Sequence, residues 1–123
     1  MKDSKNISKV LIEKDKTYLV MIRADNGKLD LPGGHCHVGE SFVDGAIREV
    51  FEETMLVVDN LKEVISYERK KIFETSTFKG DLHLDIEENT DSIWMSKIKM
   101  AEFKISDCTD VMAFAAAYLN RKK

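Results

Sequence analysis

The spacing of apolar residues divides the chain into strands, a central helix, further strands and a final helix. Residues 7–13 and 17–24 are rich in β-branched and apolar side chains, which is typical of strands, and the polar residues 14–16 separate them. A short strand is predicted over residues 29–31. We expect the Pro-Gly-Gly sequence of residues 32–34 to end it.

The period changes to that of a helix over residues 41–55. Apolar positions recur there at three- and four-residue spacing, which predicts one helix face packed against a sheet. These positions are Val43, Ala46, Ile47, Val50, Phe51 and Thr54. Ser41, with Asp44 three residues later, predicts a variant of the capping box at the start of this helix.

The second half of the chain repeats the sequence of strands followed by a helix. Residues 61–70, 72–85 and 92–98 are predicted strands, and the alanine-rich residues 111–119 predict a closing helix. This order predicts one α/β domain over residues 1–123, with helices layered on a mixed sheet.

Composition excludes several classes of protein. The 123 residues carry a formal net charge of −3, which argues against a nucleic-acid polymer as the main partner. No apolar run approaches the roughly 18 residues that span a bilayer, and the N-terminus lacks a signal-peptide layout. We therefore expect a cytoplasmic protein without a membrane partner. The two cysteines do not form a disulfide framework.

Three carboxylates stand on one stripe of the central helix. Glu49, Glu52 and Glu53 fall within an arc of about 100° and repel one another, so an isolated cluster of this kind costs stability. Their alternative role is that of a solvated helix face. The preceding glycine pair favours a ligand site, because backbone can approach a ligand closely there. A hard divalent cation with oxygen ligands is the natural candidate.

These residues belong to a longer pattern, which reads Gly34-x5-Glu40-x7-Arg48-Glu49-Val50-x-Glu52-Glu53-x-Met55-Leu56. It resembles the Nudix box, G-x5-E-x7-R-E-U-x-E-E-x-G-U with U aliphatic, at every position except Met55. The resemblance implies a three-layer α/β/α sandwich and water attack at phosphorus with Mg²⁺ or Mn²⁺. It also implies that the three helix glutamates supply metal ligands, one of them also serving as general base. Glu40 and Arg48 would position this set, and the carbonyl group of Gly33 or Gly34 would complete the metal shell.

Residues outside the box add candidates with alternatives. Glu88, six residues before Trp94, resembles in its spacing an outside-box metal ligand of mutator-type triphosphate pyrophosphohydrolases; the alternative is an exposed loop carboxylate. Arg23 either reaches a substrate phosphate or is an exposed strand end. Asp110 either reads a base or caps the final helix.

Zinc and base stacking are two further possibilities. Zinc binding by residues 35–37 (His-Cys-His) is disfavoured, because alternating positions in one short loop rarely converge on one ion. Tyr67, Phe73 and Phe78 could stack on a base, although aromatic residues in strands are more often part of the core.

Met55 stands where the family has a helix-ending glycine. A left-handed backbone at this position costs a residue with a Cβ atom roughly 1–2 kcal/mol. We expect Met55 to be buried against the sheet, with either a strained backbone or a slightly longer helix. The metal ligands lie upstream and should keep their places.

The predicted function is hydrolysis of a nucleoside diphosphate linked to another group. The preferred substrate is a nucleoside or deoxynucleoside triphosphate, which would give monophosphate and pyrophosphate. ADP-ribose or another nucleoside diphosphate sugar is the alternative substrate. A catalytically silent nucleotide-binding module is the alternative class, and the retained box glutamates disfavour it. The expected partner is a small nucleotide, and the chain would be a monomer or a homodimer.

Overall fold

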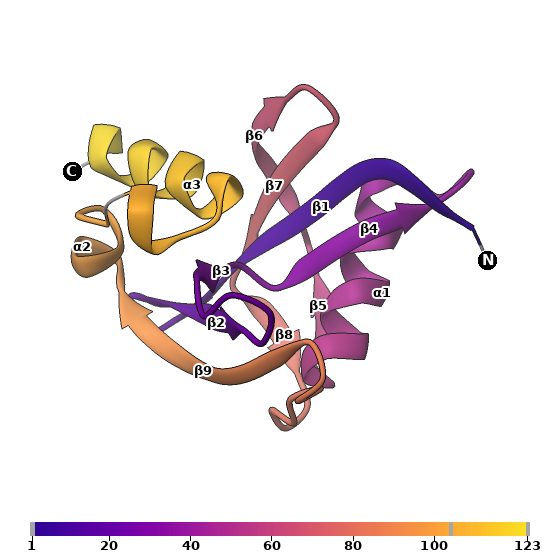
Figure 1. Cartoon of the computed structure of the whole chain (residues 1–123), viewed down its shortest axis with the longest axis horizontal. Coiled ribbons are helices and arrows are strands. Elements are labelled where there is room, and N and C mark those ends of the chain that lie inside the picture. The colour runs from indigo at the N-terminus through magenta and orange to yellow at the C-terminus, as the bar shows by residue number, and fades with distance from the viewer. Residues whose placement is uncertain (1, 104, 123) are drawn as a thin grey trace.

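A mixed β-sheet runs through the centre of the molecule (Figure 1). The computed structural model describes residues 2–103 and 105–122. The strands are β1 (Asp3–Lys14), β2 (Thr17–Arg23), β3 (Leu29–Asp30), β4 (Gly33–His37), β5 (Val57–Asp59), β6 (Lys62–Tyr67), β7 (Lys70–Thr75), β8 (Thr77–Lys79) and β9 (Asn89–Ser96). The helices are α1 (Phe42–Thr54), α2 (Lys97–Met100), the 3₁₀ turn η1 (Ile105–Asp107) and α3 (Asp110–Lys122).

The long strand β1 organises the sheet. The strand order is β3-β2-β1-β7-β6, with β4 also paired to β1 and β9 also paired to β2. β1 and β7 run parallel, whereas β1 pairs with β2 and with β4 in antiparallel fashion. The β1–β4 pairing brings the glycine pair at the start of β4 next to the middle of β1. A separate two-stranded sheet joins β5 and β8.

Alternation along the strands produces two cores, one on each face of the sheet. In β1, Val10 and Ile12 pack with α1, whereas Leu11 between them packs with the C-terminal helices. Successive strand residues point to opposite faces, so a run buried on both sides reads as continuously apolar. α1 and the α2–α3 pair therefore lie on opposite sides of the sheet (Figure 1). The expected three-layer α/β/α arrangement is confirmed.

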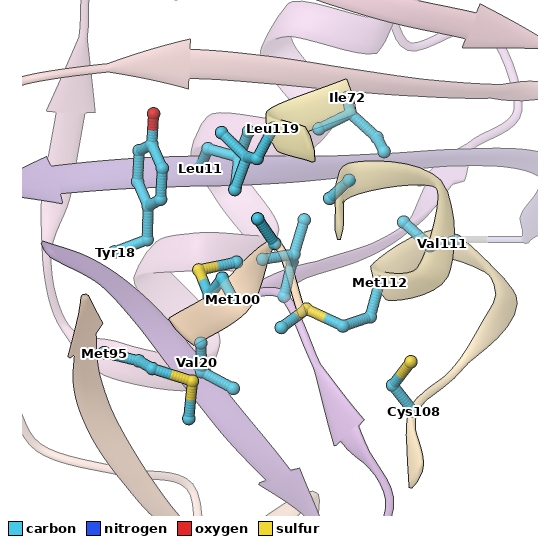
Figure 2. Close-up of a cluster of buried hydrophobic side chains, with 13 residues drawn as sticks. Leu11, Tyr18, Val20, Ile72, Met95, Met100, Cys108, Val111, Met112 and Leu119 are labelled. Atoms are coloured by element: carbon cyan, nitrogen blue, oxygen red, sulfur yellow. The ribbon is translucent and has the colours of Figure 1, made fainter. Parts of the chain in front are cut away.

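The core under the C-terminal helices is rich in methionine. Figure 2 shows Met100 and Met112 packed beside Leu11 and Val20 of the sheet. All four side chains are fully buried, and complete burial of such a side chain stabilises the fold by about 1.5–3 kcal/mol.

Among the described residues, no helix is long and apolar enough to cross a membrane.

Helix α1 begins where the sequence predicts. The Ser41 side chain accepts a hydrogen bond from the Asp44 backbone N–H at 3.0 Å, which satisfies one of the free donors at the helix start.

The expected apolar face of α1 is only partly correct, because Val43 and Phe51 are exposed. Phe51 lies about 100° around the helix from the buried Val50. The buried positions of α1 are Gly45, Ala46, Val50 and Thr54.

The expectation of a buried Met55 is wrong. Met55 ends α1 in the left-handed conformation, with φ of 66°, and its N–H donates to the Phe51 carbonyl at 2.8 Å. The backbone therefore takes the shape for which glycine is the usual residue. The side chain is 47% exposed. Burial thus offsets only part of the backbone strain.

Met55→Gly is therefore expected to stabilise the protein by about 1 kcal/mol, because it removes the left-handed strain at a position with little buried area to lose. Thermal unfolding measures the change. Met55→Ala is the matched control, since it keeps Cβ and removes only the rest of the side chain. An equal gain in both variants would show that the side chain, not the backbone, causes the strain.

Several strand boundaries differ from expectation. The predicted strand over residues 61–70 ends at Tyr67, because Glu68 has φ of 51° and forms a turn. The predicted strand over residues 72–85 is divided into β7, which begins at Lys70, and the short β8 of the separate sheet. Residues 81–85 instead run along the end of α1, where the backbone N–H groups of His83 and Asp85 donate to α1 carbonyl oxygens at 2.9 and 3.0 Å.

Two further differences follow from local chemistry. The predicted strand over residues 92–98 ends at Ser96, because this side chain caps α2 by accepting from the Lys99 N–H. The Pro-Gly-Gly sequence follows the end of β3, as expected, but a further strand, β4, begins at Gly33.

Candidate functional site

Arg48 holds the box carboxylates in place. Its guanidinium donates to Glu49 at 2.9 Å and to Glu52 at 2.7 Å from one nitrogen. The other two nitrogens each donate to Glu40 at 3.0 Å. The paired contact with Glu40 is the bidentate geometry that makes arginine–carboxylate bonds strong and directional. Arg48 thus links the loop before α1 to two glutamates of the helix.

Glu40 connects this cluster to strand β4. Its carboxylate also accepts from the His37 backbone N–H at 2.8 Å. The hydrogen bond from Arg48 is the largest cause that lowers the pKa of Glu40 below its ordinary value. Glu40 therefore stays ionised and is held against Arg48 by two hydrogen bonds.

Glu53 lies deepest among the glutamates of α1. One carboxylate oxygen accepts from the Gly33 backbone N–H at 2.8 Å, and the other faces the Asn89 amide at 3.4 Å. Burial raises the pKa of Glu53 to about 7, and the nearby ammonium of Lys9 offsets part of this effect. Burial also raises the pKa of Glu49, and Arg48 acts against it. These carboxylates favour a positive ligand.

The two glycines are needed for different reasons. A Cβ atom on Gly33 would lie 2.1 Å from the Ser8 carbonyl oxygen, so only glycine lets β4 approach β1 this closely. A Cβ atom on Gly34 would lie 2.6 Å from a carboxylate oxygen of Glu49. The missing side chain at Gly34 therefore leaves room for the Glu49 carboxylate beside the backbone.

The predicted site residues gather around one cavity of about 390 Å³, in which carboxylates outnumber cationic side chains. Its lining includes Arg23, Gly33, Gly34, Glu49, Glu52, Glu53 and Glu88, together with Lys9, Asp30, Asp85 and Thr109. Arg48 and Glu40 are not part of this lining and support the glutamates through the contacts described above. The Glu88 backbone is fixed at the cavity edge, since its carbonyl accepts from the Ala24 N–H at 3.0 Å.

The chemistry of this lining suits a hard divalent cation. Across residues 2–103 and 105–122, no three His, Cys, Asp or Glu side chains are already drawn together as a metal shell. The reason is that Arg48 holds Glu49 and Glu52, while the Gly33 N–H holds Glu53. Rotation about the glutamate side-chain bonds would turn these oxygens into the cavity that they border. The carboxylate donors of this cavity therefore fit Mg²⁺ or Mn²⁺.

Arg23 is already committed to carboxylates of its own. It donates to Asp25 at 2.9 and 2.7 Å and to Asp30 at 3.3 Å. Asp30 in turn accepts from the Thr109 hydroxyl at 2.9 Å, which ties β3 to the start of α3. Arg23 lines the cavity, but a phosphate would have to compete with two carboxylates for it.

Two other candidates from the sequence, His35 and Asp110, also line the cavity. Cys36 is fully buried, and the strand alternation of β4 places His35 and His37 on the other side. These three residues therefore cannot share one metal ion. Asp110 pairs with Lys70 at 3.0 Å and is the first residue of α3. The capping residue is Thr109 instead, whose hydroxyl accepts from the Met112 N–H at 3.3 Å.

The three aromatic candidates for base stacking contact the protein itself. Phe73 is part of the core, with 3% of its surface exposed. Tyr67 stacks on Phe114 with ring centroids 3.9 Å apart, and Phe78 stacks on Trp94 with centroids 5.8 Å apart.

Sequence reasoning missed several residues that border the glutamates. Asp85 lines the cavity, and Asn89 faces Glu53 from the start of β9. Lys9 and Asp30 form a buried ion pair of 2.9 Å at the same cavity. A charged residue inside the apolar run of β1 is the signal that could have identified Lys9, because buried charges are paired.

Comparison with known proteins identifies the family. The family model described as NUDIX domain matches residues 5–107. A "MutT-like protein" of Streptomyces ambofaciens is 39% identical over 56 residues, a match that covers 46% of this chain. That match spans only 36% of the length of this curated relative.

Solved structures show the same fold. The MutT protein of Methanosarcina mazei Go1 has a TM-score of 0.74 and 24% identity, with 98% of this chain and 96% of that chain covered. The MutT NUDIX hydrolase of Burkholderia pseudomallei has a TM-score of 0.73 and 16% identity, with 91% and 95% covered. Because the family model spans most of the residues, the chain belongs to the NUDIX family.

Proposed function

We propose that this member of the NUDIX family is a divalent-metal-dependent nucleotide pyrophosphohydrolase. Its preferred substrate is a nucleoside or deoxynucleoside triphosphate, which it converts to monophosphate and pyrophosphate. The observation that carries the proposal is the meeting of Glu49, Glu52 and Glu53 with the glycine pair and Glu88 around one cavity. The same proposal takes residues 1–123 as one domain.

The glutamates of the cavity are the proposed ligands of Mg²⁺ or Mn²⁺. Glu49, Glu52 and Glu53 supply anionic oxygens from one helix, and Glu88 supplies a further carboxylate from the segment before β9. A bound ion would neutralise charge on the pyrophosphate oxygens and lower the pKa of the attacking water. The cavity has more carboxylates than cationic side chains, so it needs this ion before it can bind a negatively charged polyphosphate.

The reaction is a displacement at phosphorus. The water oxygen forms a bond to phosphorus, and the bridging P–O bond between the α- and β-phosphates breaks. The electron pair of that bond goes to the leaving group, so that the products are a nucleoside monophosphate and pyrophosphate. One of the three glutamates of α1 accepts the proton of the water. Arg48 and Glu40 keep these glutamates in register, because their hydrogen bonds join the helix to the loop before it. Positioning of this kind supplies much of the rate in phosphoryl transfer.

We expect triphosphates to give monophosphate and pyrophosphate, rather than diphosphate and phosphate. Chromatography of the products from a panel of nucleoside triphosphates and ADP-ribose, with Mg²⁺ and with Mn²⁺, measures this pattern. Turnover of ADP-ribose alone, to AMP and ribose phosphate, would replace the proposed substrate with a nucleoside diphosphate sugar. Turnover without added metal would contradict the metal dependence.

A further inference from the structure

A buried lysine lies directly against the glycine pair. Lys9 of β1 is only 6% exposed. Its ammonium donates to the Asp30 carboxylate at 2.9 Å, to the Gly33 carbonyl at 3.1 Å and to the Leu31 carbonyl at 3.2 Å. An ammonium has three donors, and here each has an acceptor. Lys9 is therefore held in one place as a cation, because burying an unpaired or unbonded charge would be costly.

The partners of Lys9 are fixed as firmly as the ammonium. Asp30 is 3% exposed and also accepts from the Thr109 hydroxyl at 2.9 Å and from Arg23 at 3.3 Å. The N–H of Gly33 binds Glu53, while its C=O binds Lys9. The backbone at Gly33 is thus anchored from both sides, to the glutamate stripe and to the buried cation.

This arrangement decides what the Gly33 carbonyl can do. A divalent ion on that oxygen, at a metal–oxygen distance of about 2.1 Å, would stand at most about 5 Å from the ammonium, given the 3.1 Å hydrogen bond. Two positive charges that close repel, and the cavity wall screens them less than water does. The carbonyl is therefore a good partner for Lys9 and a poor one for a metal ion.

We propose that Lys9 is a positioning residue that acts as a built-in cation of the candidate active site. Its ammonium donates a hydrogen bond to the Gly33 carbonyl oxygen, so that the glutamate carboxylates bind the divalent ion without this oxygen. The inference rests on the proposed function, because it concerns the metal proposed there. It also departs from one alternative of the sequence-based expectation, in which the carbonyl group of Gly33 or Gly34 would complete the metal shell.

Mn²⁺ binding to the full chain without substrate tests this role. The informative variant is the double substitution Lys9→Met with Asp30→Asn, which removes the ammonium without leaving a buried carboxylate unpaired. Asp30→Asn alone is the matched control, because it breaks the same ion pair and keeps the ammonium. Lys71→Met, which breaks the ion pair with Glu63 at a partly exposed position, controls for loss of a lysine.

We expect the double variant to bind Mn²⁺ at least tenfold more tightly than wild type, as measured by electron paramagnetic resonance titration; this corresponds to about 1.4 kcal/mol. Asp30→Asn and Lys71→Met should bind no more tightly than wild type. An unchanged dissociation constant in the double variant would overturn the role of Lys9 and leave the proposed function standing. Absence of Mn²⁺ binding by folded wild type would overturn both.

A second measurement uses wild type and does not depend on the folding of a variant. In protein labelled with ¹⁵N and ¹³C, the coupling across the hydrogen bond from the Lys9 ammonium to the Gly33 carbonyl carbon should persist when Mg²⁺ saturates the site. Loss of that coupling, with a shift of the Gly33 carbonyl resonance, would show that the metal ion is coordinated by this oxygen and would overturn the proposal.

Discussion

Replacing Glu53 with glutamine is expected to lower kcat at least ~10²-fold, which corresponds to about 2.7 kcal/mol in the activation barrier. Glutamine keeps the size of the side chain and can still accept from the Gly33 N–H, the contact that Glu53 makes at 2.8 Å. It loses the negative charge that the proposed metal ion requires. The expected loss therefore comes from charge at the reacting phosphorus and not from a change in shape.

Two controls separate this effect from damage to the fold. Glu63→Gln removes a carboxylate that pairs with Lys71 on the sheet, away from the cavity lining, and should leave kcat unchanged. The far-ultraviolet circular dichroism of Glu53→Gln should match wild type. Full activity of Glu53→Gln in excess Mg²⁺ would contradict the proposed metal site.

The stability of Glu53→Gln in metal-free buffer should differ from wild type in a pH-dependent way. Burial raises the pKa of Glu53 to about 7, above the value in the unfolded chain. The folded protein therefore binds the proton more tightly, and wild-type stability falls as the pH rises from the unfolded pKa towards 7. A neutral glutamine lacks this loss. Urea unfolding at pH 5 and pH 8 measures the free energy of unfolding of both proteins. The value for the variant, relative to wild type, should be higher at pH 8 than at pH 5.

The glutamate stripe and the helix that carries it could be predicted because both are local in sequence. The three- and four-residue spacing of α1 and the cap at Ser41 need no information about distant residues. The two-faced sheet was also predictable in outline, since β1 and β2 read as apolar runs.

Contacts across the fold explain what the sequence did not reveal. Asn89 reaches Glu53 only because the segment before β9 is hydrogen-bonded to the end of α1, and no local pattern encodes that docking. The pairing of Lys9 with Asp30 joins strands β1 and β3 across 21 positions. The burial expected for Met55 failed because the left-handed backbone at the helix end left its side chain half exposed.

Gly33 begins β4, a strand that the sequence pattern did not predict. Its φ of 129° lies in the region that side chains rarely adopt. A Cβ atom there would meet the Ser8 carbonyl oxygen at 2.1 Å and the Lys9 Cα atom at 2.8 Å. Both are backbone atoms of β1, so no side-chain rotation can relieve the overlap. The strand itself would have to move.

Gly33→Ala is therefore expected to destabilise the protein by about 3–5 kcal/mol, combining backbone strain with an overlap that the strands must absorb. Gly39→Ala is the matched control. Gly39 also has a positive φ, of 86°, but a Cβ atom there would meet nothing within 4 Å, so only the roughly 1–2 kcal/mol of left-handed strain applies. Urea unfolding measures both free energies. Since Gly33 also donates to Glu53 and accepts from Lys9, displacement of β4 should lower kcat in whatever fraction of Gly33→Ala remains folded. Equal losses of stability in the two variants would show that β4 can retreat from β1 without cost, and the close approach of these strands would then not be the reason for glycine at this position.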